Sequence, residues 1–104
     1  MSTHVYAGTA LQVNDEGFLL DASVWTPAIG ESIAAELGLA LNPRHWQVIS
    51  FAREDFAAKG QSPGLRRITT NTPVNMKEIY ELFPKGPGKL VARIAGLPKP
   101  KSCL

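Results

Sequence analysis

Three proline dipeptides divide the middle of the 104-residue chain into separate helices. They are Thr26-Pro27, Asn42-Pro43 and Ser62-Pro63. In each pair a side-chain oxygen stands directly before a proline. That oxygen can accept a hydrogen bond from a free backbone N–H at a helix start, and a proline at the first helical position loses nothing by lacking a donor. The three pairs therefore predict three helix starts.

We expect these helices to cover residues 27–37, residues 43–59 and a shorter stretch after Pro63. Apolar residues recur in them every three or four positions, which places those residues on one face. The expected core residues are Ile29, Ile33 and Leu37 in the first helix, Trp46, Ile49, Ala52 and Phe56 in the second, and Leu65 and Ile68 in the third. Gly38 and Gly60 are expected to end the first two helices.

Two further helices are expected before the C-terminal end. Asn75 and Glu78 resemble a capping box that opens a helix over NMKEIYELF, and Pro84 ends it. The fifth helix is expected from Pro87 to about Ala95. Its predicted core residues are Leu90, Val91 and Ile94.

The N-terminal residues 5–21 have the pattern of short strands. Two apolar runs, 10–13 and 18–20, flank a polar turn that ends in Gly17, and Gly8-Thr9 is a second possible turn. Such a small sheet needs other elements packed on it. We therefore predict an α+β fold, with an antiparallel hairpin or meander on about five short helices. Residues 1–96 form the single domain, and residues 97–104 form a flexible C-terminal arm.

The last nine residues, GLPKPKSCL, are expected to form an extended arm. Gly96 is expected to end the fifth helix and to leave the base of the arm free to swing, while Pro98 and Pro100 fix φ near the polyproline value. Such a path spans roughly 20 Å from Gly96 to Cys103. This geometry suits a thiol that is delivered into the active site of another protein. A cysteine without function in a disordered end is the alternative.

Basic residues are concentrated near this arm. Residues 84–104 contain five basic and no acidic side chains, whereas residues 1–83 contain six basic and nine acidic ones. The five are Lys85, Lys89, Arg93, Lys99 and Lys101. Lys99 and Lys101 favour the thiolate of Cys103, and the terminal carboxylate of Leu104 opposes it. The charge indicates either a solvated basic end or an electrostatic contact with an acidic partner.

The composition is that of an ordinary soluble domain, with 44% hydrophobic and 19% charged residues. The single cysteine excludes an internal disulfide framework, and no apolar run approaches the roughly 20 residues of a membrane span. The N-terminus lacks the pattern of a secretory signal. We therefore expect a cytoplasmic protein with no membrane partner. No metal site is expected, because His4 and His45 have no carboxylate or thiol at ligand spacing.

A helix-turn-helix is an alternative interpretation of residues 43–71. Its polar recognition face would carry Arg66, Arg67, Thr69, Thr70 and Asn71. DNA-binding domains are usually strongly basic, whereas residues 1–83 are net acidic. This alternative predicts salt-sensitive DNA binding that does not depend on Cys103.

The block LFPKGPGKLVARIAGLPKPKSCL, residues 82–104, resembles the C-terminus of the DsrC/TusE family of sulfur-carrier proteins. The hallmark of that family is GLPKP followed by a penultimate cysteine, which corresponds here to residues 96–100 and Cys103. The segments GFLLDASVW, LNPRHWQVISFAREDF and QSPGLRR are also similar, so the resemblance covers nearly the whole chain. It weakens over residues 68–79, where this sequence is shorter than many relatives.

The resemblance implies a sulfur relay. Family members carry sulfur on the penultimate cysteine as a persulfide, or as a trisulfide in members with a second cysteine eleven positions earlier. Ala92 stands at that position here. The chain is therefore similar to the single-cysteine, TusE-like members, which relay sulfur toward 2-thiouridine in tRNA. Related single-cysteine forms occur beside sulfur-oxidation proteins, and this role stays open.

The resemblance also implies partners and roles. The partners are a sulfur donor like TusBCD or DsrEFH and an acceptor like a tRNA thiolase or a sulfite reductase, with no cofactor and no direct contact with nucleic acid. Cys103 is the expected catalytic residue of what is a sulfurtransferase component rather than a self-sufficient enzyme. The residues expected to present it and to bind the partner are Gly96, Pro98, Lys99, Pro100, Lys101, Lys85, Lys89 and Arg93. Arg93 either holds a persulfide or the terminal carboxylate, or is a solvated helix charge.

Overall fold

A computed structural model describes residues 2–101 of the chain. Its N-terminal part is an antiparallel hairpin of β1 (Ser2–Tyr6) and β2 (Thr9–Val13), in which Ser2 pairs with Val13 and Tyr6 with Thr9. Ala7 and Gly8 connect the strands with positive φ angles of 51° and 77°. Two consecutive residues with positive φ are typical of the tight turns that match the twist of a hairpin. The predicted small sheet is therefore present.

The second predicted turn has a different structure from the one expected. The Asn14 side chain accepts hydrogen bonds from the backbone N–H groups of Glu16 and Phe18, and Leu19 then makes only an isolated bridge to Val13. Phe18 and Leu19 are 1% and 4% exposed. The segment after the turn thus places Phe18 and Leu19 in the core, leaves Leu20 49% exposed, and does not continue as a third strand.

Residues 2–101 contain a short 3-10 helix, η1 (Ala22–Val24), which was not predicted, and after it the five predicted α-helices. These are α1 (Pro27–Glu36), α2 (Pro43–Lys59), α3 (Leu65–Asn71), α4 (Met76–Leu82) and α5 (Pro87–Ile94). The side chains of Thr26, Asn42 and Asn75 accept hydrogen bonds at the starts of α1, α2 and α4. These three predicted caps are confirmed.

Two details of the helix starts differ from the prediction. The reciprocal capping box lies at α2, where the His45 side chain accepts from the backbone of Asn42. At α4, Asn75 caps Glu78, but the Glu78 carboxylate instead binds Arg44. Ser62 does not cap α3, which begins two residues after Pro63 with no side-chain cap. Local spacing did not reveal that the side chains of Glu78 and Ser62 have partners far away in the sequence.

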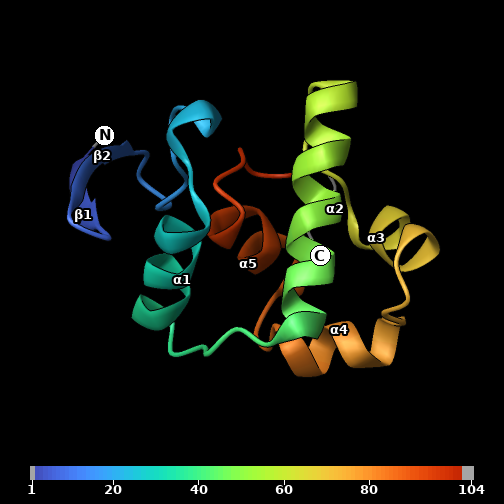
Figure 1. Cartoon of the computed structure of the whole chain (residues 1–104). Coiled ribbons are helices and arrows are strands. Elements are labelled where there is room, and N and C mark those ends of the chain that lie inside the picture. Colours follow the sequence, from blue (N-terminus) through green and yellow to red (C-terminus); the bar gives the residue numbers. More distant parts are fainter. Residues whose placement is uncertain (1, 102–104) are drawn as a thin grey trace.

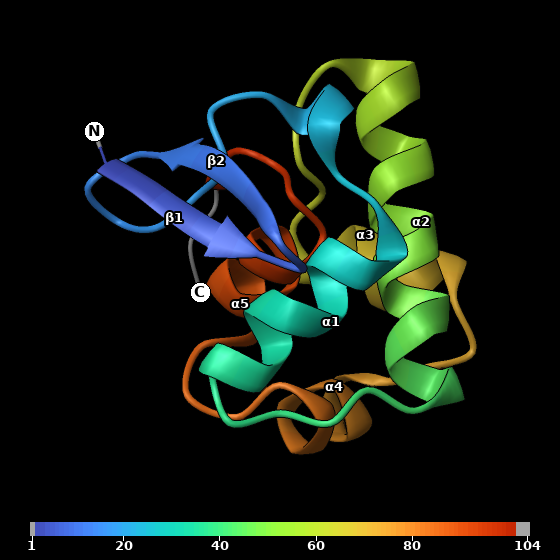
Figure 2. The ribbon, with the colours of Figure 1, turned by 60° about the vertical axis from the view of Figure 1, so that its left-hand side comes forward.

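Helix α5 occupies the centre of the molecule (Figures 1 and 2). It contacts α1, α2 and α4, and the hairpin packs on α1. Because other helices surround α5, it is buried on more than the predicted stripe. Ala92, which was not among the predicted core residues, is 2% exposed, whereas Leu90, which was, is only half-buried. Among the described residues no helix is long and apolar enough to span a membrane.

Candidate functional site

The C-terminal end of α5 is closed by a turn that uses the first residues of the GLPKP motif. Ile94 is the last residue of α5 and Ala95 is its C-cap, and Gly96 follows with a φ of +71°. The N–H of Gly96 donates to the Arg93 carbonyl, and the N–H of Leu97 donates to the Ala92 carbonyl at 2.9 Å. This is a Schellman motif, in which glycine adopts the left-handed conformation and an apolar residue follows it. Leu97 is accordingly 1% exposed.

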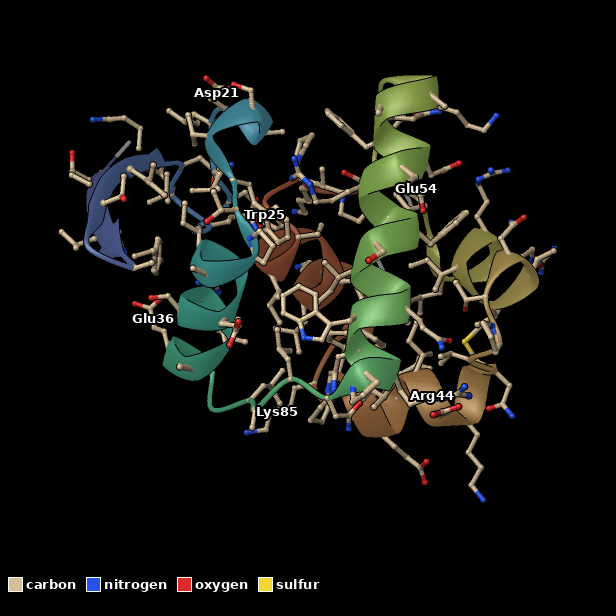
Figure 3. The ribbon with its side chains drawn as sticks, in the orientation of Figure 1. Asp21, Trp25, Glu36, Arg44, Glu54 and Lys85 are labelled. Atoms are coloured by element: carbon tan, nitrogen blue, oxygen red, sulfur yellow. The ribbon has the colours of Figure 1, made fainter. Side chains whose placement is uncertain are left out.

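Two side chains from distant elements satisfy the remaining carbonyls of this helix end. Trp25 Nε1 donates to the Ile94 carbonyl at 2.8 Å, and Arg53 Nη1 donates to the Ala95 carbonyl at 2.7 Å. Arg53 also donates to the carbonyl of Ala22 and lies 4.3 Å from the centre of the Trp25 ring. Burial lowers the pKa of Arg53. Figure 3 shows Trp25 directed toward α5. The helix end is therefore held at a fixed position by η1 and α2.

Gly96 is a close-packing position. A Cβ on Gly96 would stand 2.3 Å from Cδ1 of Trp25, well inside the distance that real Cβ atoms keep. The expectation that Gly96 leaves the base of the arm free to swing is therefore wrong, because Gly96 is packed tightly against Trp25. The residue is glycine because the turn needs a positive φ and because the Trp25 ring lies against it.

The predicted arm begins against the domain rather than apart from it. Ser62 Oγ donates to the Pro98 carbonyl at 2.5 Å, and Lys99 Nζ lies 3.0 Å from Glu16 Oε2. Pro100 is buried and Lys101 is exposed. Pro98 thus contacts the loop before α3 and Lys99 contacts the turn that follows β2, so that residues 98–100 are docked on the domain. Cys103 lies outside the described residues.

Arg93 is half-buried beside the hairpin, and so it is not a fully solvated helix charge. A Cβ on Gly17 would stand 2.7 Å from Arg93 Nη2, so the guanidinium lies against the turn that follows β2. Its Nε is buried without a hydrogen-bond partner among the described residues. Burial and the bond to Glu36 raise the pKa of Tyr6, while the Arg93 charge opposes this rise.

The basic residues that the sequence grouped together are not one cluster. Lys85 and Lys89 are exposed at the beginning of α5, whereas Lys99 and Lys101 follow its end. A helix of this length separates its ends by about 12 Å. In Figure 3 Lys85 accordingly lies far below Trp25. The fold thus gives Lys101 neighbours that its sequence position did not indicate.

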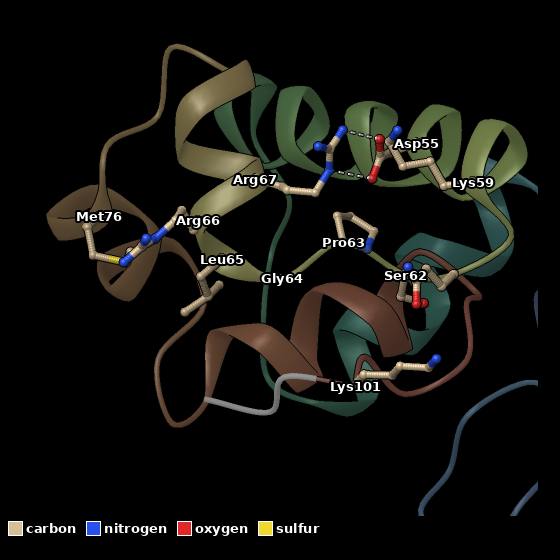
Figure 4. A pocket seen from close by; sticks show the side chains of 11 residues that line it. Asp55, Lys59, Ser62, Pro63, Gly64, Leu65, Arg66, Arg67, Met76 and Lys101 are labelled. Carbon is tan, nitrogen blue, oxygen red and sulfur yellow. Dashed lines mark hydrogen bonds and ion pairs between the residues drawn. The ribbon is translucent and has the colours of Figure 1, made fainter.

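These neighbours form a groove of about 730 Å³ between the end of α2, the start of α3 and the arm (Figure 4). Its charged residues are Asp55, Lys59, Arg66, Arg67 and Lys101, and its other lining residues are Gln61, Ser62, Pro63, Gly64, Leu65 and Met76. We call it the cationic groove. Sequence reasoning missed it because its residues come from four separate segments.

An ion pair fixes one wall of the cationic groove. Arg67 donates from Nε and Nη2 to both oxygens of Asp55, at 3.0 and 2.6 Å. The hydrogen bonds from Arg67 hold the pKa of Asp55 below its ordinary value, and the charge of Lys59 adds to this effect. Thr69 and Asn71 bind backbone carbonyls within α3. Arg67, Thr69 and Asn71, three of the side chains proposed for the recognition face, therefore make hydrogen bonds within the domain itself.

The described residues contain no group of three or more histidine, cysteine, aspartate or glutamate side chains that could hold a metal ion. The arrangement offers instead a rigid helix end, a short segment docked by polar contacts, and a cationic groove beside it. These features define the class of small α+β proteins that present a C-terminal segment from a fixed base.

The chain belongs to the family of DsrC-like proteins, whose model matches residues 5–104. The gamma subunit of the dissimilatory-type sulfite reductase of Nitratidesulfovibrio vulgaris is 37% identical over 105 residues, which cover 100% of both chains. Sulfurtransferase TusE of Escherichia coli (strain K12) is 34% identical over 107 residues, covering 96% of this chain and 98% of that protein.

Solved structures agree with this assignment. The oxidized gamma subunit of the dissimilatory sulfite reductase (DsrC) from Archaeoglobus fulgidus has a TM-score of 0.85 and 31% identity, and the match covers 99% of this chain and 100% of that one. DsrC of Allochromatium vinosum has a TM-score of 0.84 and 34% identity, covering 98% and 97%. The predicted family and the α+β fold are confirmed, and these comparisons give the helix-turn-helix alternative no support.

Proposed function

We propose that this protein carries sulfane sulfur as a persulfide on Cys103 and passes it to an acceptor enzyme. The relatives named sulfurtransferase and sulfite reductase subunit support a role in sulfur relay. The observation that carries the proposal is the fixed base at Gly96 and Leu97, followed by a docked segment that leads to the only cysteine of the chain. A carrier needs its thiol at a defined distance from a surface that partners recognise.

The proposed exchange balances without a cofactor. The Cys103 thiolate attacks the outer sulfur of a donor persulfide, a new S–S bond forms, and the donor leaves as a thiolate. A nucleophile of the acceptor then attacks the same outer sulfur, and Cys103 leaves as a thiolate. No second cysteine is available to form an intramolecular disulfide, because position 92 is alanine. The chain therefore acts as a transferase component, with donor and acceptor proteins as its partners.

The finer steps are also part of the proposal. We place the protein in the cytoplasm, where reducing conditions preserve free thiols. Its similarity to TusE supports an acceptor that forms 2-thiouridine in tRNA. Its similarity to the sulfite reductase gamma subunit supports a second candidate, a partner in dissimilatory sulfur metabolism. Lys99 lies in the docked segment beside Glu16, Lys101 follows it, and Lys85 and Lys89 add positive charge farther away. These lysines would steer an acidic partner.

Loading of the protein tests the carrier role directly. The reduced chain is incubated with inorganic polysulfide and weighed intact, and we expect one added sulfur atom that a reductant removes. Cys103→Ser should gain none. If the unaltered protein gains no reducible sulfur from polysulfide or from a persulfide-bearing enzyme, the proposal is wrong.

Complementation distinguishes the two acceptors. The protein is expressed in Escherichia coli lacking TusE, and 2-thiouridine is measured in hydrolysed tRNA. Restored 2-thiouridine that requires Cys103 supports the tRNA pathway. Normal loading in vitro without any restoration favours the second candidate.

A further inference from the structure

We propose that the cationic groove binds an acidic, partly apolar peptide segment of the relay partner. This inference rests on the proposed function, since it assigns the surface on which the donor or acceptor docks. It commits to a protein segment as the occupant, and nucleic acid or a second copy of this chain are outcomes of the test.

The charges of the groove support an acidic occupant. Four of its side chains are cationic, namely Lys59, Arg66, Arg67 and Lys101, and one is a carboxylate. Asp55 is already bound by Nε and Nη2 of Arg67, so it does not compensate the other three cations. Lys59, Arg66 and Lys101 are all exposed. A cleft lined by one sign of charge attracts ligands of the opposite sign.

The apolar part of the groove supports a peptide rather than a simple anion. Pro63 and Leu65 are buried in the groove wall, and Met76 is 43% exposed at its edge. In Figure 4 Met76 and Arg66 lie at the same end of the groove, with Leu65 beneath them. Methionine adapts to apolar partners of different shape, and interfaces combine apolar centres with charged rims. A segment that alternates acidic and apolar side chains matches both features.

The position of the groove links it to sulfur transfer. Ser62 lines the groove and also donates to the Pro98 carbonyl, and Lys101 is both a wall of the groove and the last described residue of the arm. Cys103 follows Lys101 by two positions, which is at most about 7 Å of chain. A partner bound in the groove is therefore within reach of the residue that carries the sulfur in our proposal.

Peptide binding to the full-length protein tests this assignment. The probe is a fluorescent twelve-residue peptide of glutamates and leucines, followed by anisotropy at low and high salt, and the reference peptide has glutamine in place of glutamate. We expect the acidic peptide to bind, the glutamine peptide to bind much more weakly, and salt to reduce the difference.

Matched variants locate the site. Arg66→Gln and Lys77→Gln each remove one exposed positive charge, and of the two residues only Arg66 lines the groove. We expect Arg66→Gln to weaken binding roughly two- to fivefold and Lys59→Gln combined with it roughly tenfold, with Lys77→Gln near the unaltered value. Circular dichroism melting is the control that verifies that each variant is folded. Equal effects of Arg66→Gln and Lys77→Gln overturn the assignment.

Two further measurements separate the alternatives. If tRNA binds more tightly than the acidic peptide and loses affinity with the same groove substitutions, or if the groove substitutions abolish a dimer of this chain, the peptide assignment is wrong. Polysulfide loading of Cys103 is measured on the same variants and should be unchanged, because a small donor does not need the groove. Failed loading with intact peptide binding contradicts the carrier role and leaves the groove assignment standing.

Discussion

The two halves of the GLPKP motif are held in very different ways. Gly96 and Leu97 are part of the core, fixed by a Schellman turn, by the Trp25 ring and by the Arg53 guanidinium. Among the contacts of the following residues 98–101 are a partly buried hydrogen bond from the Ser62 hydroxyl and an exposed ion pair between Lys99 and Glu16, and Pro100 is buried. The base is held by a backbone turn and by close packing against Trp25, whereas the arm depends on single polar contacts, of which the Lys99–Glu16 ion pair is exposed and weak.

This difference shows how one short motif can have a fixed starting point and still carry a segment that leaves the surface. A buried base fixes where the arm starts, and weak contacts allow the arm to leave the surface at little cost. Substitutions in the base should therefore lower the stability of the whole domain. Substitutions under the arm should change the arm alone. The single cysteine makes the second effect measurable, because a nitroxide label reacts only at Cys103.

The largest loss in the free energy of unfolding is expected for Gly96→Ala. The new Cβ would meet the Trp25 ring at 2.3 Å, and alanine must adopt a φ of +71°. Trp25 would have to move and lose its bond to Ile94, so we expect a loss of about 3 kcal/mol or more in the free energy of unfolding. Urea denaturation followed by circular dichroism measures it.

Gly60→Ala is the matched control for this substitution. Gly60 ends α2 with a φ of +76°, but a Cβ there would meet nothing within 4 Å. Gly60→Ala should therefore lower the free energy of unfolding by about 1 kcal/mol through the positive φ alone, without a steric collision. If both substitutions cost the same, the contact with Trp25 does not hold the base.

Arg53→Met should cause the next largest loss in the free energy of unfolding. It leaves the carbonyls of Ala22 and Ala95 without their side-chain donor and removes the stacking on Trp25. We expect a loss of about 2 kcal/mol in the free energy of unfolding. Arg66→Met removes an exposed arginine that holds no such carbonyls, and it should cost little. Equal losses in the two variants would contradict the role assigned to Arg53.

Asp55→Asn separates domain stability from arm contacts. Arg67 lowers the pKa of Asp55 below its ordinary value of 3.8 in the folded state. The contribution of the pair is therefore complete above the unfolded-state pKa and is lost as the pH falls through the folded-state pKa. We expect Asp55→Asn to lower the melting temperature by a few degrees at neutral pH and to have no effect at acidic pH below the folded-state value. The spectrum of a label at Cys103 should not change, and a difference that persists in acid would exclude the ion pair as its cause.

Ser62→Ala should act on the arm with little effect on the domain. It removes the partly buried bond to the Pro98 carbonyl, and that bond holds the arm rather than an element of the core. The free energy of unfolding should fall by less than about 1 kcal/mol. The nitroxide line shape at Cys103 should narrow as the arm gains freedom. Ser50→Ala, on an exposed face of α2, is the control and should leave the line shape unchanged.

The accuracy of the sequence analysis follows the range of the interactions involved. Thr26, Asn42 and Asn75 were identified correctly as caps, because a cap binds a backbone group two or three residues away. Ser62 has the same pattern, but its partner lies 36 residues along the chain. Gly96 was identified as a helix end from local signals, and its contact with Trp25 was not, because that ring comes from another element.

The candidate site shows the same limit. The GLPKP motif and its cysteine were evident, because they are continuous in the sequence. The cationic groove combines residues 55–67, Met76 and Lys101, so no spacing along the chain predicts it. Lys85 and Lys89 were grouped with the arm by charge alone, and the length of α5 places them at its other end.

Lys99→Gln is expected to give the smallest effect and the clearest view of the arm. The ion pair with Glu16 is exposed, with side-chain accessibilities of 37% and 49%, so its loss should cost less than about 0.5 kcal/mol. Salt should weaken the same contact in the unaltered protein, and so the label at Cys103 should become more mobile as ionic strength rises. In Lys99→Gln that salt response should be reduced. An unchanged response would mean that Ser62 and the buried Pro100 hold the arm without help from the Glu16 carboxylate.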